Sequence, residues 1–309
     1  LRISDEIIKG SVESYRKLRN TVRYMLGALD GWTDAEAIEA RKMPGLERWV
    51  LHRLSELDEQ VRAAYNVYDF KKVMSLLINF CGVDLSAVYF DVRKDSLYCD
   101  PRFETEEVWD GDTANFGNRR RAARTVMAAV LERLLTWLAP IMPFTMEEAF
   151  LESHLEGSAA SVHLLQFPDT PVGWRDADLA ARWEKIFTVR RVVTGALEVE
   201  RREKRIGASL ESTPRVLIAD EALIEAFEGE DAGDLFITSG AELVHSSTSE
   251  GGGFTLDDTP GVVVHPVKAS GVKCRRSWKY FDPAEADPAF PDITPRDALA
   301  VKAWDAMHD

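Results

Sequence analysis

The sequence predicts a mainly α protein, with a helical bundle over residues 1–155 and a small α+β module after it. In the first half of the chain, apolar residues recur at steps of three and four, the period of a helix with one buried face. Beyond residue 213, short β-branched or alternating runs such as RVLIAD and GVVVHP are typical of strands. With 309 residues, 45% of them hydrophobic, the chain is long enough for about two domains with their own cores.

Residues 11–29 carry two faces when wound into a helix. The face expected to be buried consists of Val12, Tyr15, Leu18, Val22, Met25, Leu26 and Leu29. The opposite face carries Arg16, Arg19, Asn20 and Arg23, with no acid among them. Guanidinium groups bind phosphate through paired hydrogen bonds and stack on bases, so this face is a candidate surface for a polyanion. The alternative is a solvated face whose arginines pair with acids of neighbouring helices.

Cap residues and apolar stripes define the other helices of the bundle. We expect the first helix to begin at Ser4 and to end at Asp30-Gly31, and the second to follow Pro44-Gly45. The second helix is expected to bury Leu46, Val50, Leu54, Leu57 and Val61. Asp69 is expected to cap a third, whose stripe is Phe70, Val73, Met74, Leu77, Phe80 and Cys81. Cys81 is interpreted as a small core residue.

The rest of the bundle is less regular. A helical turn or two from Asp84 to Arg93 leads into KDSLYCD at 94–100, which is predicted to be a polar loop. The next helix is expected to open at Asn118 with the run Arg119, Arg120, Arg121 and Arg124. Thr145 and Glu148 have the spacing of a capping box and predict the start of the last helix.

Three further segments complete the predicted organisation. Residues 156–212 are expected to hold a Gly- and Pro-containing linker and a long helix from about Ala177 to Lys204. In residues 213–270, the runs RVLIAD, DLFITSG, AELVH and GVVVHP are predicted to be strands around the helical stretch EALIEAF. Residues 271–309 show no clear period and predict an irregular tail with one closing helix.

Charge and composition set further bounds. The net charge is −14, but residues 220–309 hold 18 acids against 7 Lys and Arg, so −11 of it lies there. The rest of the chain is near neutral and has local basic patches at 16–23, at 119–124 and from Arg190 to Arg205. We find no apolar run near the ~20 residues of a membrane helix and no signal sequence, and the three widely spaced cysteines suit a reducing compartment. A cytoplasmic location is therefore expected.

Several motifs resemble a known family. These are SYRKLRNT at 14–21, DF at 69–70, FCGVDLSAVYFDVRKDSLY at 80–98, LAPIMPFTMEEAF at 138–150, RIGASLES at 205–212 and ITSGAEL at 237–243. In this order and spacing, they resemble the C-terminal part of bacterial isoleucyl-tRNA synthetases, which are class I enzymes. LAPIMPFTMEE is shared with the valyl and leucyl enzymes, whereas SYRKLRNT with KDSLY and the RIGASLE segment point to the isoleucyl enzyme.

The resemblance implies a function for each part. It implies that the bundle is an anticodon-binding domain that packs against the anticodon stem-loop of isoleucine tRNA, and that the C-terminal module helps to read the anticodon. The HIGH and KMSKS motifs do not occur, so we expect a fragment that lacks the catalytic and editing domains and is inactive alone. ATP and Mg²⁺ would belong to the full-length isoleucine-tRNA ligase. A monomer that needs no cofactor and contacts no membrane is expected.

The tail departs from the family pattern. Many bacterial isoleucyl enzymes end with two CxxC pairs that hold zinc and help to bind tRNA. Here GVKCRRSWKY at 271–280 has Ser277 where the second cysteine would stand, and no cysteine follows. Zinc needs about four N or S ligands, and Cys274 with the distant His245, His265 and His308 does not supply them. We expect no zinc.

Basic and aromatic residues remain in this tail, namely Lys273, Arg275, Arg276, Trp278 and Lys279. Such a cluster can hold phosphate and stack on a splayed base. The alternative is that Trp278 packs in the tail's own small core. No catalytic or metal site is expected. The residues expected to bind tRNA are Arg16, Arg19, Asn20, Arg23, Lys94, Tyr98, Lys204, Lys273, Arg275 and Trp278.

Two alternatives to a synthetase fragment are a free-standing RNA-binding module and a helical interaction scaffold without RNA. The scaffold would use the acidic region 220–309 as its docking surface.

Overall fold

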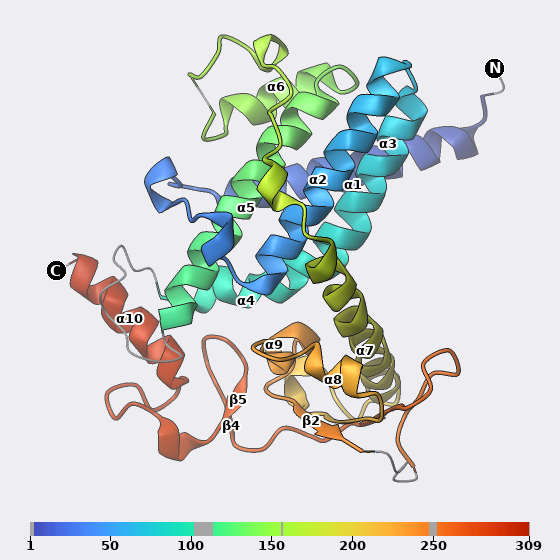
Figure 1. Ribbon diagram of the computed structural model, residues 1–309. Helices are drawn as coiled ribbons and strands as arrows, with labels where there is room; N and C mark the ends of the chain where they lie inside the picture. The colour runs from blue at the N-terminus through green and yellow to red at the C-terminus, as the bar shows by residue number, and fades with distance from the viewer. Residues whose placement is uncertain (1–2, 102–113, 156, 247–251, 309) are drawn as a thin grey trace. The chain divides into compact units, whose positions relative to one another are not determined.

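The chain is mainly α-helical with a small sheet module, which confirms the predicted fold class (Figure 1). The structure is a computed structural model that describes residues 3–101, 114–155, 157–246 and 252–308. It divides into two compact units: unit 1 comprises residues 1–97 and 104–176, and unit 2 comprises residues 98–103 and 177–309.

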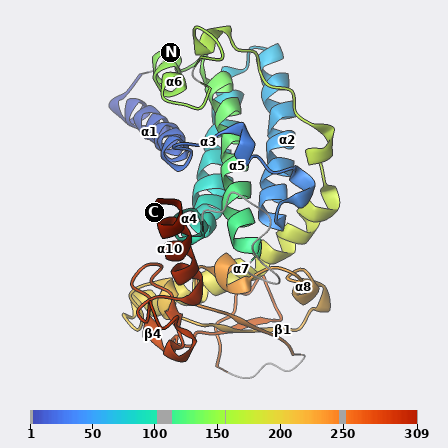
Figure 2. The same cartoon turned by 90° about the vertical axis from the view of Figure 1, so that its left-hand side faces the viewer.

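Unit 1 is a bundle of helices. Its helices are α1 (Asp5–Ala28), α2 (Gly45–Asn66), α3 (Phe70–Asn79), α4 (Phe90–Cys99, whose last two residues fall in unit 2), α5 (Ala114–Leu138) and α6 (Pro143–Leu151). A π-helical stretch, η3 (Phe80–Tyr89), joins α3 to α4 without a break. The helices α2, α3 and α5 run side by side, and α1 packs against α5 and η3 (Figure 2). Single 3-10 turns η1 (Asp34–Glu36), η2 (Ala40–Lys42), η5 (Val162–Leu164) and η6 (Val172–Trp174) lie in the connections.

The caps and buried stripes predicted from local sequence are largely confirmed. The Ser4 side chain accepts a hydrogen bond from the backbone N–H of Ile7, and the Asp69 carboxylate accepts one from the N–H of Lys72. Every residue of the predicted α2 stripe is buried. Cys81 is fully buried, as expected of a core residue.

Other apolar residues lie outside the core. In α1 the buried stripe begins only at Leu18, whereas Val12 and Tyr15 are each 40% exposed. Phe70, the predicted first residue of the α3 stripe, is 45% exposed. Periodicity shows which residues share a face but not how far along a helix its neighbours reach, so the burial of these three was predicted wrongly.

The predicted polar loop at 94–100 is also wrong, because helix α4 continues to Cys99. Val92, Leu97 and Cys99 are buried, so a continuing helix places these residues in the core. Lys94 is exposed and Asp95 is half-buried, and these two residues gave the segment its polar character. The polar residues of this stretch thus mark one face of a helix.

The predicted capping box at Thr145 and Glu148 does not form. Helix α6 begins two residues earlier, with Pro143 in its first turn and no side-chain cap. The Thr145 hydroxyl instead lies 3.2 Å from the Tyr15 hydroxyl of α1. A proline at the first helical position needs no N–H partner, and it overrides the cap motif that follows it.

The helical run Phe70–Cys99 has the length and composition of a membrane-crossing helix, contrary to the expectation of no such run. The core helix of a globular protein has the same properties. In this bundle, Val73, Leu77, Leu85 and Tyr89 are fully buried, and the run contacts α1 and α2.

A buried ion pair joins α2 to α4. The Arg93 guanidinium donates to both carboxylate oxygens of Glu47, with Nε to Oε1 at 2.6 Å and Nη2 to Oε2 at 2.7 Å. The two side chains are 5% and 0% exposed. Paired hydrogen bonds of this geometry are what allow opposite charges to remain buried together.

The larger segment of unit 2, residues 177–309, begins with the long helix α7 (Ala177–Arg202). A three-stranded sheet follows, in the order β2 (Glu242–His245), β1 (Arg215–Ile218) and β3 (Val262–His265), with β1 parallel to β2 and antiparallel to β3. Val216 pairs with Leu243 on one side and Val264 on the other, and α7 packs against β3. The short helices α8 (Glu221–Glu225) and α9 (Ala232–Phe236) contact α7.

The predicted strand DLFITSG is wrong, since its first residues end helix α9. The Asp231 carboxylate caps this helix by accepting from the N–H of Asp234, and Ile237 ends it with φ of 58°. The tail holds a two-stranded sheet of β4 (Val272–Lys273) and β5 (Tyr280–Phe281). The 3-10 turn η7 (Ser209–Glu211) precedes β1, and the 3-10 turn η8 (Pro283–Glu285) follows β5. The expected closing helix is α10 (Pro295–His308).

We expect Glu47→Gln to lower the free energy of unfolding by about 3 kcal/mol, because it leaves the Arg93 charge buried without its partner. Urea titration followed by far-UV circular dichroism measures this. The control is Glu13→Gln, which removes an exposed pair with Arg16 and is expected to change the free energy by less than about 1 kcal/mol. Equal effects of the two substitutions would contradict the role given to the buried pair.

Candidate nucleic-acid interface

The predicted polar face of α1 lies on the surface of unit 1. Arg16, Arg19, Asn20 and Arg23 are all exposed, while Leu18, Thr21, Val22 and Met25 on the other side of the helix are buried. We call these four exposed residues, together with the neighbouring Lys17, the α1 ridge. Three guanidinium groups and an ammonium group are thereby presented along about two turns of one helix.

Within the described residues, the α1 ridge has few charge partners. Arg16 donates to Glu13 of the same helix at 2.8 Å, and both side chains are more than 60% exposed. No hydrogen bond or ion pair to the side chains of Lys17, Arg19, Asn20 or Arg23 occurs in the described part of the chain. The alternative of arginines paired with acids of neighbouring helices is therefore not what this face shows.

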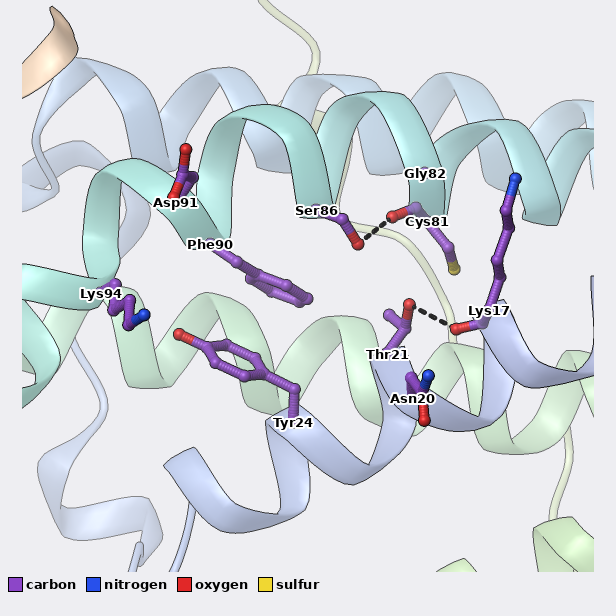
Figure 3. A pocket seen from close by; sticks show the side chains of 10 residues that line it. All are labelled: Lys17, Asn20, Thr21, Tyr24, Cys81, Gly82, Ser86, Phe90, Asp91 and Lys94. Carbon is purple, nitrogen blue, oxygen red and sulfur yellow. Dashed lines mark hydrogen bonds between the residues drawn. The ribbon is translucent and has the colours of Figure 1, made fainter. Parts of the chain in front are cut away.

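A pocket of about 500 Å³ opens beside the α1 ridge, between α1 and the helical run η3–α4 (Figure 3). Helix α1 contributes Lys17, Asn20, Thr21 and Tyr24, and the facing wall contributes Cys81, Gly82, Ser86, Phe90, Asp91 and Lys94. The first three residues of that wall come from the π-helical stretch, whose wider turns often occur at functional sites. The pocket thus joins two predicted tRNA-binding residues, Asn20 and Lys94.

Aromatic rings and cations give the pocket its character. The rings of Tyr24 and Phe90 face each other with centroids 4.5 Å apart, and Lys17 and Lys94 stand at opposite ends (Figure 3). The hydroxyls of Thr21 and Ser86 are already bonded to backbone carbonyls, of Lys17 and Cys81 respectively. An apolar surface between two ammonium groups suits a flat, negatively charged ligand such as a nucleotide.

The Cys81 thiol lies in this wall but is not a nucleophile. Burial raises its pKa to about 12; the nearby Asp84 charge adds to the effect, and a hydrogen bond with Thr21 opposes it. The thiolate is the reactive form of cysteine, and it is scarce at neutral pH when the pKa is this high.

The arginine run of α5 is not a surface patch. Arg119, Arg120 and Arg124 are buried, although a basic patch was predicted at 119–124. Arg120 donates to the carbonyl of Leu97, and Arg124 donates to the Glu36 carboxylate at 2.6 Å and to the Asp30 carbonyl at 2.8 Å. Arg124 thus fastens the connection after α1 to α5, and Arg120 fastens the end of α4 to α5.

The basic patch from Arg190 to Arg205 is likewise tied to neighbouring groups. Arg190 donates to the carbonyl of Leu235, and Arg191 pairs with Asp258 at 2.8 Å. Arg205 pairs with Glu200 at 2.6 Å. Lys204, a predicted tRNA-binding residue, is exposed at the end of α7 with φ of 58°, and no described residue bonds its ammonium group.

In unit 2, Trp278 and Lys273 form an exposed pair. The indole is 62% exposed, and the Lys273 ammonium lies 5.4 Å from the ring centroid. Trp278 has φ of 64°, a strained conformation for a bulky residue, which points to a role for its exposed side chain. The alternative, in which Trp278 packs in a small core, does not match this exposure.

The other residues of the basic and aromatic cluster are engaged elsewhere. Arg275 lies 3.4 Å from the Asp292 carboxylate, and Lys279 bonds Asp234 at 2.5 Å. Arg276 donates to the carbonyls of Tyr98 and Cys99. Tyr98 itself is 64% exposed.

Sequence reasoning missed the pocket and one buried carboxylate, Asp297. The pocket joins α1 to a helical run about sixty residues away, and no local pattern signals such a contact.

Asp297 accepts hydrogen bonds from Cys274 and Ser277. The sequence signal for this cluster is that Thr294 and Asp297 have the same three-residue spacing as Cys274 and Ser277.

Unit 1 is an α-helical bundle that presents the α1 ridge and the adjoining pocket on one face. Residues 47–218 match the family described as the anticodon-binding domain of tRNA ligase, and the chain belongs to that family. This confirms the resemblance seen in the motifs.

Its relatives include isoleucine–tRNA ligases from Brucella abortus, Agrobacterium fabrum and Caulobacter vibrioides. They are 47%, 48% and 48% identical over 306 residues, which is 99% of this chain. The chain spans about 30% of the length of these relatives.

All three cysteines are buried, so we expect none to react quickly with a thiol reagent at pH 8. For Cys81 this pH also lies far below its raised pKa of about 12, so the thiol stays protonated. Ellman's reagent is expected to titrate no fast thiol in the native protein and three in denaturant. One fast thiol that disappears in Cys81→Ser would contradict the environment described for Cys81.

Proposed function

We propose that this chain binds the anticodon arm of isoleucine tRNA through the α1 ridge and the adjoining pocket of unit 1. The observation that carries the proposal is a row of cations without acidic partners from other helices, beside a pocket lined by aromatic rings, in a member of the anticodon-binding family. Cations on a helix bind backbone phosphates, which gives affinity and register but little sequence preference.

The pocket is proposed to take one unstacked nucleotide of the anticodon loop. Its volume of about 500 Å³ falls within the range usual for small-molecule sites, about 300–1,000 Å³. Tyr24 and Phe90 offer a surface for the base, the Asn20 amide can donate to and accept from its edge, and Lys17 and Lys94 can hold the phosphates on either side. Base contacts of this kind supply specificity.

In unit 2, Trp278 and Lys273 are proposed as a second contact with the RNA. An exposed indole beside an ammonium group can stack on a base while the cation meets a phosphate. Arg275, Tyr98 and Lys204 are exposed and are proposed as further contacts.

In the full-length protein, this binding is proposed to support ATP-dependent attachment of isoleucine to its tRNA in the cytoplasm. The proposal rests on relatives named isoleucine–tRNA ligase, of which this chain spans about 30%. The catalytic and editing domains, ATP and Mg²⁺ would lie in the remaining part, and the protein is proposed to be a monomer. A free-standing RNA-binding module would bind RNA equally well without them, whereas a scaffold would bind none.

We expect Arg19→Ala and Arg23→Ala each to weaken tRNA binding and to flatten the plot of log affinity against log salt by about one unit, because each removes one phosphate contact. Neither substitution is expected to change which anticodon is preferred. Fluorescence anisotropy across a salt series measures both effects.

The control for this series is Arg41→Ala. Arg41 is an exposed arginine of η2 whose side chain pairs with Glu39. It lies outside the α1 ridge, so its loss should leave the salt dependence unchanged. If Arg19→Ala and Arg23→Ala behave like Arg41→Ala, the α1 ridge does not contact phosphate.

We expect Gly82→Leu to lower tRNA affinity roughly tenfold by filling the pocket where a base would lie. A Cβ at Gly82 meets no atom within 4 Å, so the new side chain enters open space. Gly10→Leu is the control, because a Cβ there also meets nothing and Gly10 does not line the pocket. Equal affinities of the two variants would exclude the pocket from the RNA interface.

A further inference from the structure

Three side chains of the C-terminal segment converge on one oxygen of the buried Asp297 carboxylate. Cys274 and Ser277 form one pair three residues apart, and Thr294 and Asp297 form another. Asp297 Oδ2 accepts from Cys274 Sγ at 2.9 Å, from Ser277 Oγ at 2.6 Å and from Thr294 Oγ1 at 2.9 Å. Cys274 and Asp297 are both fully buried.

Two arginines complete the surroundings of this carboxylate. Asp297 Oδ1 accepts from Arg276 Nη1 at 2.9 Å and from Arg296 Nη2 at 3.1 Å. The buried negative charge is therefore balanced by two guanidinium groups and satisfied by five donors, the condition under which a charge can stay buried. Arg276 also donates to the carbonyls of Tyr98 and Cys99, so the carboxylate ties the end of α4 into unit 2.

The zinc ion that the family resemblance implies does not fit these residues. A structural zinc site uses four ligands, almost always thiolate sulfur or imidazole nitrogen. Among Cys274, Ser277, Thr294 and Asp297 only one residue is a cysteine, and its thiol donates a hydrogen bond to the Asp297 carboxylate. No group of three or more His, Cys, Asp or Glu side chains suited to a metal occurs in the described parts of the chain.

Cys274 also shapes the turn that carries the exposed Trp278. The Cys274 sulfur accepts the backbone N–H groups of Arg276 and Ser277, each at 3.4 Å, and the Cys274 carbonyl accepts the N–H of Trp278 at 3.1 Å. These bonds close the turn 274–278 and leave Trp278 in its strained, exposed conformation. The turn is held to the rest of unit 2 through Cys274, Arg276 and Ser277, all of which bond to Asp297.

We propose that Asp297 is a positioning residue that takes the structural place of a metal ion, holding the turn 274–278 and its exposed Trp278 by hydrogen bonds alone. This part of the chain is thus independent of zinc. The inference concerns metal content and the position of Trp278 and does not rest on RNA binding, so either can fail without the other.

The test combines metal analysis with three variants of the whole chain. Protein from zinc-supplemented cells is expected to contain no stoichiometric zinc, and EDTA is expected to leave its Tm unchanged. Asp297→Asn is expected to lower the Tm by roughly 4 °C or more and to shift the indole N–H resonance of Trp278, assigned from its loss in Trp278→Phe. Ser277→Ala removes one donor and is expected to cause smaller shifts of the same signal, which gives a second reading if Asp297→Asn does not fold.

The matched control is Asp292→Asn, which makes the same change at an exposed carboxylate beside Arg275. Asp292→Asn is expected to change neither the Tm nor the chemical shift of the Trp278 indole N–H. Stoichiometric zinc, a Tm that falls in EDTA, or a Trp278 resonance that does not respond to Asp297→Asn or Ser277→Ala would each overturn the proposal.

Discussion

The buried ion pair between Glu47 and Arg93 is the constraint on which the candidate interface of unit 1 depends. It fastens α4 to α2 at a point where two charges are almost fully removed from water, so any shift of α4 would expose or separate them. Phe90 lies three residues before Arg93 and Lys94 directly after it, and both line the pocket beside α1. A charge pair in the core thus sets the position of the side chains on the surface.

Much of this bundle could be predicted from local sequence, because caps and apolar stripes act within a few residues. Ser4, Asp69 and the α2 stripe took their predicted roles. The errors arose where distant parts decide the outcome. KDSLYCD has the polar composition of a loop, yet the burial of Leu97 and Cys99 against other elements keeps it helical. Tertiary packing overrides local propensity in such segments.

Charge raises the same difficulty for the candidate site. The runs Arg16–Arg23 and Arg119–Arg124 look alike in sequence, but the first lies on an exposed face and the second bonds to carbonyls and carboxylates inside unit 1. Only the partners, which come from distant residues such as Glu36, distinguish them. In the tail, the sequence shows that Ser277 stands where the family pattern has a cysteine. Only the structure shows that Ser277 donates a hydrogen bond to the Asp297 carboxylate.

The most direct measurement is the affinity of this chain for isoleucine tRNA and for the same tRNA with its anticodon replaced, across a range of salt concentrations. If the α1 ridge holds phosphates and the pocket holds a base, binding should be salt-dependent and should weaken markedly on replacement. Binding that ignores the anticodon would contradict base recognition and leave only a backbone contact. No binding at low salt would contradict the account altogether and favour a scaffold.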